Sequence, residues 1–219
     1  GWCGEVSTPL TLPPDTVEEV PFDTKRGLRL SRHDVFIASK VWSTNLGAVR
    51  EALDNSLEAT GLKWLDLYLI HWPVPLHSVG VEGPSQGVLW PVDDAGRIVY
   101  ATPPAMAGSP EGGTLEQDHG LLLYAWRQLE VAFDEGKVRA IGVANMPMPI
   151  LKLLYARARV KPHVHQFEAH PQLPQESMLL YCLSKRIAPM AHTALGGGGG
   201  GYESLASDPA LRAAVSIEE

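Results

Sequence analysis

Two stretches of sequence decide the fold: Val35-Phe36-Ile37-Ala38-Ser39-Lys40-Val41-Trp42 and Leu65-Asp66-Leu67-Tyr68-Leu69-Ile70-His71-Trp72-Pro73. Each is a short apolar run with a polar, ionisable residue near its end, which is typical of a buried parallel strand. Between them a helix is predicted from about Asn45 to Gly61, with one apolar face made by Leu46, Val49, Leu53 and Leu57. A right-handed β-α-β crossover then places Lys40 and His71 at the carboxyl end of one sheet, where α/β enzymes hold their chemistry.

Composition and charge narrow the class of protein. The chain has 219 residues, of which 45% are hydrophobic and 20% charged, enough for the core of one substantial domain or two small ones. A net charge of −7 and a pI near 5.6 argue against nucleic acid or an anionic membrane as partner, although local groups can still bind an anionic cofactor. With only two cysteines, Cys3 and Cys182, and no apolar run of about 20 residues, we expect a soluble, cytoplasmic protein without a disulfide framework.

The chain divides into an irregular head and one α/β domain. Residues 1–30 are rich in proline and show no regular period, so we expect an irregular segment there and a single domain over residues 31–219. A long excursion over residues 72–113 leaves the carboxyl end of a predicted strand, and loops of this length are usually functional or disordered. Beyond it helices are predicted over 122–133, 150–158, 175–185 and 208–215, alternating with strands over 138–143, 164–168 and 187–191.

This alternation predicts a parallel α/β architecture, either an open doubly wound sheet or a β/α barrel. The open-sheet dinucleotide fold normally shows a G-x-G-x-x-G turn after its first strand, and the sequence has none there. The glycine run over residues 196–201 is better explained as a flexible linker than as a phosphate cradle, because no helix starts directly from it. A barrel is therefore favoured, although five predicted strands are found where a closed barrel has eight.

Several motifs occur in the order seen in one known family. They are 36–42 (FIASKVW), 65–73 (LDLYLIHWP), 136–145 (GKVRAIGVAN), 166–171 (QFEAHP) and 194–196 (ALG). Over roughly residues 31–217 the chain resembles the aldo-keto reductase superfamily. The resemblance implies a (β/α)8 TIM barrel, of which about five βα units are recognisable here. It also implies NADP(H) as cofactor and the reduction of aldehydes or ketones to alcohols, without a metal.

The resemblance also implies roles for individual residues. Lys40 and His71 match the catalytic lysine and histidine, which suits a reaction that must deliver a hydride to a carbonyl carbon and a proton to its oxygen. Taken alone, each could instead be a polar residue that ends a strand. Four residues match positions that contact the cofactor: Asn145, Gln166, His192 and Leu195. Three tryptophans are assigned to the substrate, a small carbonyl compound: Trp42, Trp72 and Trp90.

Several departures from the family pattern stand out. Ala144 replaces the usual serine before Asn145, and His192 replaces the aromatic that stacks on the nicotinamide, with less stacking area than a phenol. Residues 1–30 contain no tyrosine, so the family's proton donor has no match, and we interpret Asp15 and Asp23 as loop acids rather than as the family aspartate. We also expect the first, second and eighth strands, and the segment that grips the 2′-phosphate, to be missing from this sequence. An open arc of five strands would be poorly stable alone.

Two other classes of function remain open. One is a metal-dependent barrel hydrolase, suggested by His163 and His165, which lie two residues apart on one strand face, and by His71 and His170 at other strand ends. Its weakness is that Gln166 would then face the opposite way, and the simpler interpretation is that these histidines pack in the interior. The other is a truncated, inactive homologue that acts as a binding or interaction protein. The sequence predicts neither the carbonyl substrate nor the oligomeric state.

Overall fold

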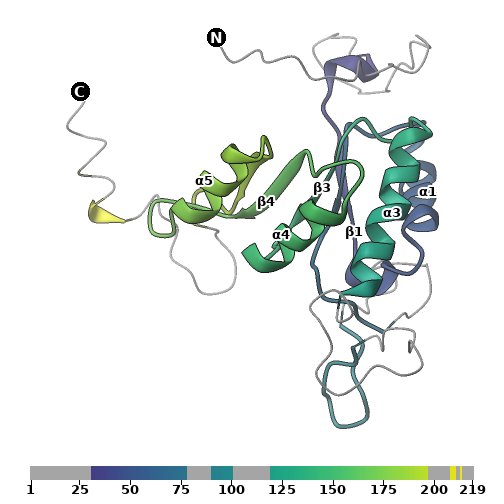
Figure 1. The fold of residues 1–219 in the computed structure, drawn as a ribbon, viewed down its shortest axis with the longest axis horizontal. Helices are drawn as coiled ribbons and strands as arrows, with labels where there is room; N and C mark the ends of the chain where they lie inside the picture. The colour runs from purple at the N-terminus through teal and green to yellow at the C-terminus, as the bar shows by residue number, and fades with distance from the viewer. Residues whose placement is uncertain (1–30, 78–89, 101–118, 197–207, 211–212, 214–219) are drawn as a thin grey trace, which may run out of the picture.

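The structure is a computed structural model that describes residues 31–77, 90–100, 119–196, 208–210 and 213. These residues form a five-stranded parallel sheet in the order β1-β2-β3-β4-β5, so each strand pairs with its neighbour in sequence (Figure 1). The strands are β1 (Ala38–Val41), β2 (Leu67–Ile70), β3 (Ile141–Ala144), β4 (Val164–Glu168) and β5 (Ala188–His192). Together with the alternating helices, this sheet confirms the predicted parallel α/β class.

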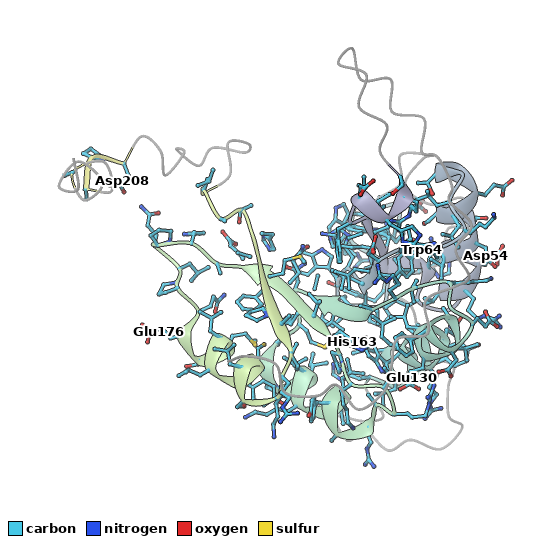
Figure 2. The ribbon with its side chains drawn as sticks, turned by 90° about the horizontal axis from the view of Figure 1, so that it is seen from above. Asp54, Trp64, Glu130, His163, Glu176 and Asp208 are labelled. Atoms are coloured by element: carbon cyan, nitrogen blue, oxygen red, sulfur yellow. The ribbon has the colours of Figure 1, made fainter. Side chains whose placement is uncertain are left out.

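Helices cover one face of the sheet. They are α1 (Val49–Thr60), α3 (Gly120–Asp134), α4 (Met148–Arg157) and α5 (Glu176–Ser184). Seen from above, they form an arc along one side of the strands (Figure 2). The main core lies between the two layers and is built from strand residues such as Tyr68 and Val143 and helix residues such as Leu53, Trp126 and Leu151. Burial of these apolar faces, at roughly 25 cal/mol per Å² of apolar surface, holds the helices to the sheet.

The first helix, α1, ends at the predicted residue but begins later in the chain than predicted. Gly61 adopts a left-handed conformation with φ of 67°, and its N–H bonds to the carbonyls of Leu57 and Glu58, which closes α1. The predicted start near Asn45 is wrong. Ser43–Asn45 instead forms a short 3-10 turn whose last carbonyl accepts the N–H of Ala48, so the α-helix begins only at Val49.

The other face of the sheet is the inner face of the curved arc. Lys40 pairs with Leu69, Leu69 with Gly142, Gly142 with Val164 and Val164 with Ala188, so one row of residues crosses all five strands. Gly142 occupies the tightest place in this row, because a Cβ there would lie 2.3 Å from the carbonyl oxygen of Val164. Strands carry alternate residues on opposite faces, so the row fixes which side chains point inward.

A buried ion network closes the amino end of the sheet. The carboxylate of Asp66 accepts hydrogen bonds from Arg32 Nη2 at 2.8 Å, from the backbone N–H of Ile37 at 2.8 Å and from Arg139 Nη1 at 3.0 Å. Arg32 and Asp66 are only 1% and 4% exposed. The guanidinium of Arg32 also lies 3.6 Å from the ring centre of Trp64, a cation–π contact. The charges at this end are therefore paired.

Other predicted boundaries shift by a few residues or lie outside the described part of the chain. Val164–Glu168 is a strand with the predicted bounds, whereas β3 starts at Ile141 rather than at 138 because Val138 forms only an isolated bridge to Leu65. Residues 1–30, and most of the helix predicted over 208–215, are not described. Within the described residues, every helix is too short or too polar to cross a bilayer.

Candidate active site

Lys40 and His71 lie at the carboxyl edge of the sheet, as the sequence predicts. Lys40 is in β1 and lies on the inner face through its pairing with Leu69. His71 follows β2 directly, and its N–H donates to the carbonyl oxygen of Val41 at 3.0 Å. Because both residues belong to neighbouring parallel strands, the crossover through α1 brings them to one place on the inner face.

The amine of Lys40 contacts an amide. Its Nζ donates to Oε1 of Gln166 at 2.6 Å, across the inner face from β1 to β4. Half-burial lowers the pKa of the Lys40 amine from its ordinary value, because the charged form loses hydration. The partner is neutral, so it holds the amine in place without cancelling its charge.

His71 is held as a neutral imidazole. Burial, followed by electrostatic interaction with Lys40 and with His192, lowers the pKa of His71 to about 4. Trp42 packs edge-on against the imidazole with 4.8 Å between ring centres. At neutral pH the ring therefore carries one N–H donor and one acceptor, which lets it donate a hydrogen bond to a carbonyl oxygen.

Asn145 links three strand ends. It follows β3 in the left-handed conformation, with φ of 54°, which asparagine tolerates better than most residues. Its backbone N–H donates to the carbonyl oxygen of Gln166 at 2.8 Å, and its side-chain Nδ2 donates to the carbonyl oxygen of His71 at 2.9 Å. Its Oδ1 lies 3.1 Å from Nε2 of His192. Of the residues assigned to the cofactor, Asn145, Gln166 and His192 are thus brought together.

The two amides suit a carboxamide ligand. Gln166 donates through Nε2 to Sδ of Met190 at 2.9 Å and accepts from Lys40, so among the described residues it keeps one N–H and one lone pair for a ligand. Asn145 likewise keeps one N–H and one lone pair after its bonds to His71 and His192. A planar carboxamide, which both donates and accepts, fits such a pair. Leu195 lies just beyond β5 and is 77% exposed.

The tryptophans assigned to the substrate are placed unequally. Trp90 packs edge-on against Trp42 with 5.4 Å between ring centres, so Trp42 lies between His71 and Trp90. Trp90 precedes a short hairpin that is closed by a bridge between Val92 and Ile98. Trp72 is 38% exposed, and no ring contact to it appears among the described residues. Two of the three tryptophans therefore form one aromatic wall beside His71.

Of the three histidines for which interior packing is the simpler interpretation, His163 and His165 pack against the core, whereas His170 pairs with Glu168 at 3.2 Å at the edge of the sheet. His165 is fully buried, accepts the N–H of Met146 on Nε2 at 3.1 Å, and turns Nδ1 towards Sγ of Cys182 in α5. His163 places Nδ1 3.2 Å from the backbone N–H of Ile141 and stacks obliquely on Phe133. In the described part of the chain, no three side chains of the metal-binding types lie close enough to share an ion.

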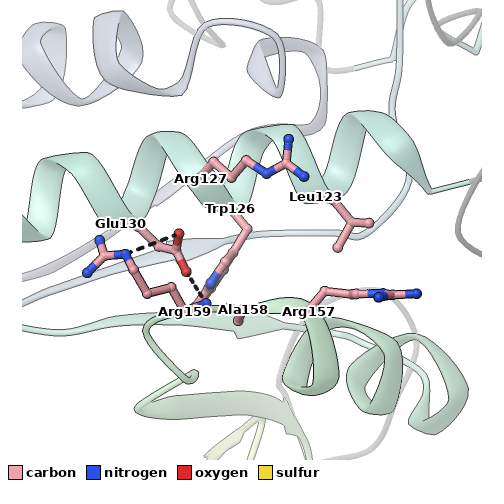
Figure 3. Close-up of a pocket in the computed structure, with 7 residues that line it drawn as sticks. All are labelled: Leu123, Trp126, Arg127, Glu130, Arg157, Ala158 and Arg159. Atoms are coloured by element: carbon pink, nitrogen blue, oxygen red, sulfur yellow. Dashed lines mark hydrogen bonds and ion pairs between the residues drawn. The ribbon is translucent and has the colours of Figure 1, made fainter.

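A pocket of about 230 Å³ lies elsewhere, in the helix layer between α3 and the end of α4 (Figure 3). Trp126 and Arg159 line it, and Glu130 anchors it by accepting the backbone N–H groups of Arg159 and Val160 at 2.7 and 2.9 Å. Arg159 also pairs with Asp134. These contacts hold the loop before β4 against α3, so the residues around the pocket have a structural role.

Sequence reasoning missed Met190 and the ion network around Asp66. Met190 is the strand partner of Gln166, and only the register of β5 on β4 makes this visible. Asp66 is an acidic residue within the apolar motif 65–73, and this position could have indicated a buried, paired carboxylate. Its partner Arg32 is 34 residues away in sequence, so spacing gave no indication of the pair.

Comparisons with known proteins all point to the same family. The family model described as Aldo/keto reductase family matches residues 23–210, beginning inside the segment expected to be irregular. The NADP-dependent D-sorbitol-6-phosphate dehydrogenase of Malus domestica is 31% identical over 85% of this chain and 55% of its own length. D-galacturonate reductase of Hypocrea jecorina is 31% identical over 84% and 52%. The aldose reductase structure from Giardia lamblia superposes with a TM-score of 0.70 at 29% identity, covering 89% of this chain and 57% of that one. The chain thus spans about half the length of these relatives.

Proposed function

The chain belongs to the aldo/keto reductase family, and we propose that its carboxyl-end site reduces an aldehyde or ketone to an alcohol with NADP(H). One observation carries the proposal. Lys40, His71, Asn145, Gln166 and His192, which come from five different strands or strand ends, converge on the inner face within a connected set of hydrogen bonds. Catalytic groups of α/β barrels lie at this edge of the sheet.

The residues divide the chemistry between them. Bound NADPH would supply the hydride that adds to the carbonyl carbon. The neutral imidazole of His71 donates a hydrogen bond to the carbonyl oxygen and so orients it. The ammonium of Lys40 stabilises the negative charge that develops on this oxygen. Because burial lowers its pKa, Lys40 is also the best-placed acid among the described residues to give the oxygen its proton.

The cofactor would be held through its carboxamide. Within the part of the chain that the structure describes, Asn145 and Gln166 each keep one unused N–H and one unused lone pair on neighbouring strands. This matches the donor and acceptor of a nicotinamide carboxamide. The first relative named above carries NADP dependence in its name, which supports NADP(H) over other cofactors. We further propose that Leu195 contacts the cofactor from the turn after β5.

We propose a hydroxyaldehyde of sugar size as substrate. The names of two relatives refer to a sugar alcohol phosphate and to a sugar acid, and the same class of substrate would reach His71 beside the wall of Trp42 and Trp90. Trp72 would contact the substrate from the exposed side of this wall. A small carbonyl compound of this kind fits a cytoplasmic enzyme, the location expected from the cysteine content.

The test is NADPH oxidation by the purified chain with a panel of aldoses and uronates, including D-galacturonate. We expect loss of NADPH absorbance that Lys40→Met and His71→Leu both abolish, while His170→Gln, a nearby histidine outside the connected set, keeps the activity. Turnover that survives in Lys40→Met would contradict the assigned roles. If no substrate is turned over, tight NADPH binding without turnover would instead favour a binding protein.

A further inference from the structure

The hydrogen bonds around Asn145 fix where one proton of His192 lies. The carbonyl oxygen of His71 can only accept, so the side-chain group of Asn145 that faces it at 2.9 Å must be the NH2 group. The oxygen of Asn145 therefore faces Nε2 of His192 at 3.1 Å. An oxygen of an amide can only accept, so Nε2 of His192 carries a hydrogen in every state of the site.

The second ring nitrogen of His192 can exist in two states. Its Nδ1 lies 3.1 Å from Oγ1 of Thr193, and the same hydroxyl is 2.8 Å from the carbonyl oxygen of His192. When the hydroxyl donates to Nδ1, the imidazole is neutral. When it donates to the carbonyl, Oγ1 accepts a hydrogen from Nδ1 and the ring is an imidazolium. Rotation of one hydroxyl thus serves both charges, and histidine is the side chain that changes charge between about pH 5 and 8.

Four other titratable side chains lie around His192: Lys40, His71, Glu168 and His170. His71 stays neutral because its pKa is lowered to about 4. The amine of Lys40 contacts Gln166 at 2.6 Å and so lies beside the same carboxamide site, and Glu168, the strand partner of His192, pairs with His170 at 3.2 Å. Asn145 and Thr193, the direct contacts, do not titrate.

We propose that His192 determines which redox form of the cofactor binds, because its imidazolium favours neutral reduced nicotinamide over the oxidised, positively charged ring. This inference rests on the proposed function. A nicotinamide whose carboxamide is held by Asn145 and Gln166 lies beside His192, since Nε2 of His192 touches the same Asn145 oxygen. NADPH and NADP+ differ in charge only at this ring, so the ratio of their affinities reports the interaction between His192 and the nicotinamide ring.

The expected effect follows from the repulsion between two unit charges at contact distance in a half-exposed site. At a separation of about 4 Å and an effective dielectric constant of about 60–80, close to that of water, it amounts to roughly fivefold to tenfold in affinity. The dissociation constant of NADP+ divided by that of NADPH should therefore rise by this factor as His192 becomes protonated.

The experiment measures both dissociation constants by quenching of tryptophan fluorescence, at about pH 5.5 and about pH 8, values that bracket histidine titration. For the unmodified chain we expect the ratio to be roughly fivefold to tenfold higher at the lower pH. His192→Gln keeps an N–H donor for Asn145 but cannot be charged, so its ratio should not change with pH while NADPH still binds. His192→Phe, which loses the donor as well, should also show a flat ratio, with weaker binding of both forms.

His170→Gln is the matched control, because His170 lies near the site but contacts Glu168 rather than Asn145. It should keep the pH dependence of the unmodified chain. A flat ratio in the unmodified chain, or a pH dependence that persists in His192→Gln, would overturn the proposal for His192 and leave the reductase function standing. Failure of either cofactor to bind at both pH values would instead overturn the proposed function and this inference with it.

Discussion

The two ends of the sheet handle charge in opposite ways. At the amino end, Asp66 is paired with Arg32 and Arg139 and also accepts a backbone N–H, and Asp66 and Arg32 are almost fully buried. At the carboxyl end, Lys40 and His71 are half-buried, and their contacts are to an amide and to an aromatic ring. A charge that is paired with an opposite charge is neutralised and has a structural role, whereas a charge held by neutral groups can still act on a ligand.

The largest effect should come from breaking the amino-end network. Asp66→Ala leaves the buried guanidinium of Arg32 without its carboxylate, and loss of one partner of a buried pair costs about 3–5 kcal/mol of unfolding free energy. Urea denaturation followed by circular dichroism measures this loss. Should Asp66→Ala fail to fold, Arg139→Ala, whose side chain is 34% exposed, gives a smaller graded loss. Unchanged stability in both variants would remove the contrast between the two ends.

Acid should destabilise the fold through buried neutral histidines. The pKa of His165 is lowered by burial from 6.5 to about 4, so between these values the unfolded chain binds a proton that the folded chain excludes. Stability is therefore full above about pH 6.5 and falls as the pH drops towards 4, by up to about 3 kcal/mol.

The matched comparison is His165→Gln against His71→Gln, with urea midpoints measured across this pH range. His165→Gln should flatten the acid dependence the more, because His71 is half-exposed and its shift is partly screened by solvent. If His71→Gln reduced the pH dependence of stability more than His165→Gln, the loss of stability in acid would arise at the carboxyl end of the sheet rather than in the helix-covered core.

The inner face between the two ends should resist added volume. Gly142→Ala places a Cβ 2.3 Å from the carbonyl oxygen of Val164 and 2.7 Å from a methyl of Leu69. Overpacking of this kind costs about 1–3 kcal/mol, measured as a lower urea midpoint. Gly47→Ala is the control, since its Cβ would meet no atom within 4 Å among the described residues. Equal losses in the two variants would mean that the inner row is loosely packed.

The smallest effect on stability should come from Lys40, the proposed catalytic lysine. Lys40→Met removes one half-buried amine and its bond to Gln166, so the unfolding free energy should change by less than about 1 kcal/mol. The same variant should abolish NADPH oxidation. A loss of stability as large as that of Asp66→Ala would show that the carboxyl end is also a structural charge cluster.

Sequence patterns predicted the parallel sheet and the meeting of Lys40 and His71 because both depend on local period and on the handedness of one crossover. They did not predict the partner of each charge. Gln166 meets Lys40 from 126 residues away, and Asn145 reaches His71 only because a positive φ turns its side chain back across the sheet. The early start predicted for α1 failed because Leu46, which keeps the apolar spacing of the helix, caps the turn at Ser43–Asn45 instead. Ala48, with φ of −138°, then separates this turn from the helix.

The central claim is that the carboxyl end of this sheet binds a nicotinamide cofactor, and its most direct test is NADPH binding to the purified chain. Tryptophan fluorescence would be followed during NADPH titration of the unmodified chain, of the double variant Asn145→Leu with Gln166→Leu, and of Arg127→Gln in the helix-layer pocket. The account predicts saturable binding that the double variant loses and that Arg127→Gln retains. Binding that survives in the double variant, or that Arg127→Gln abolishes, would contradict the account.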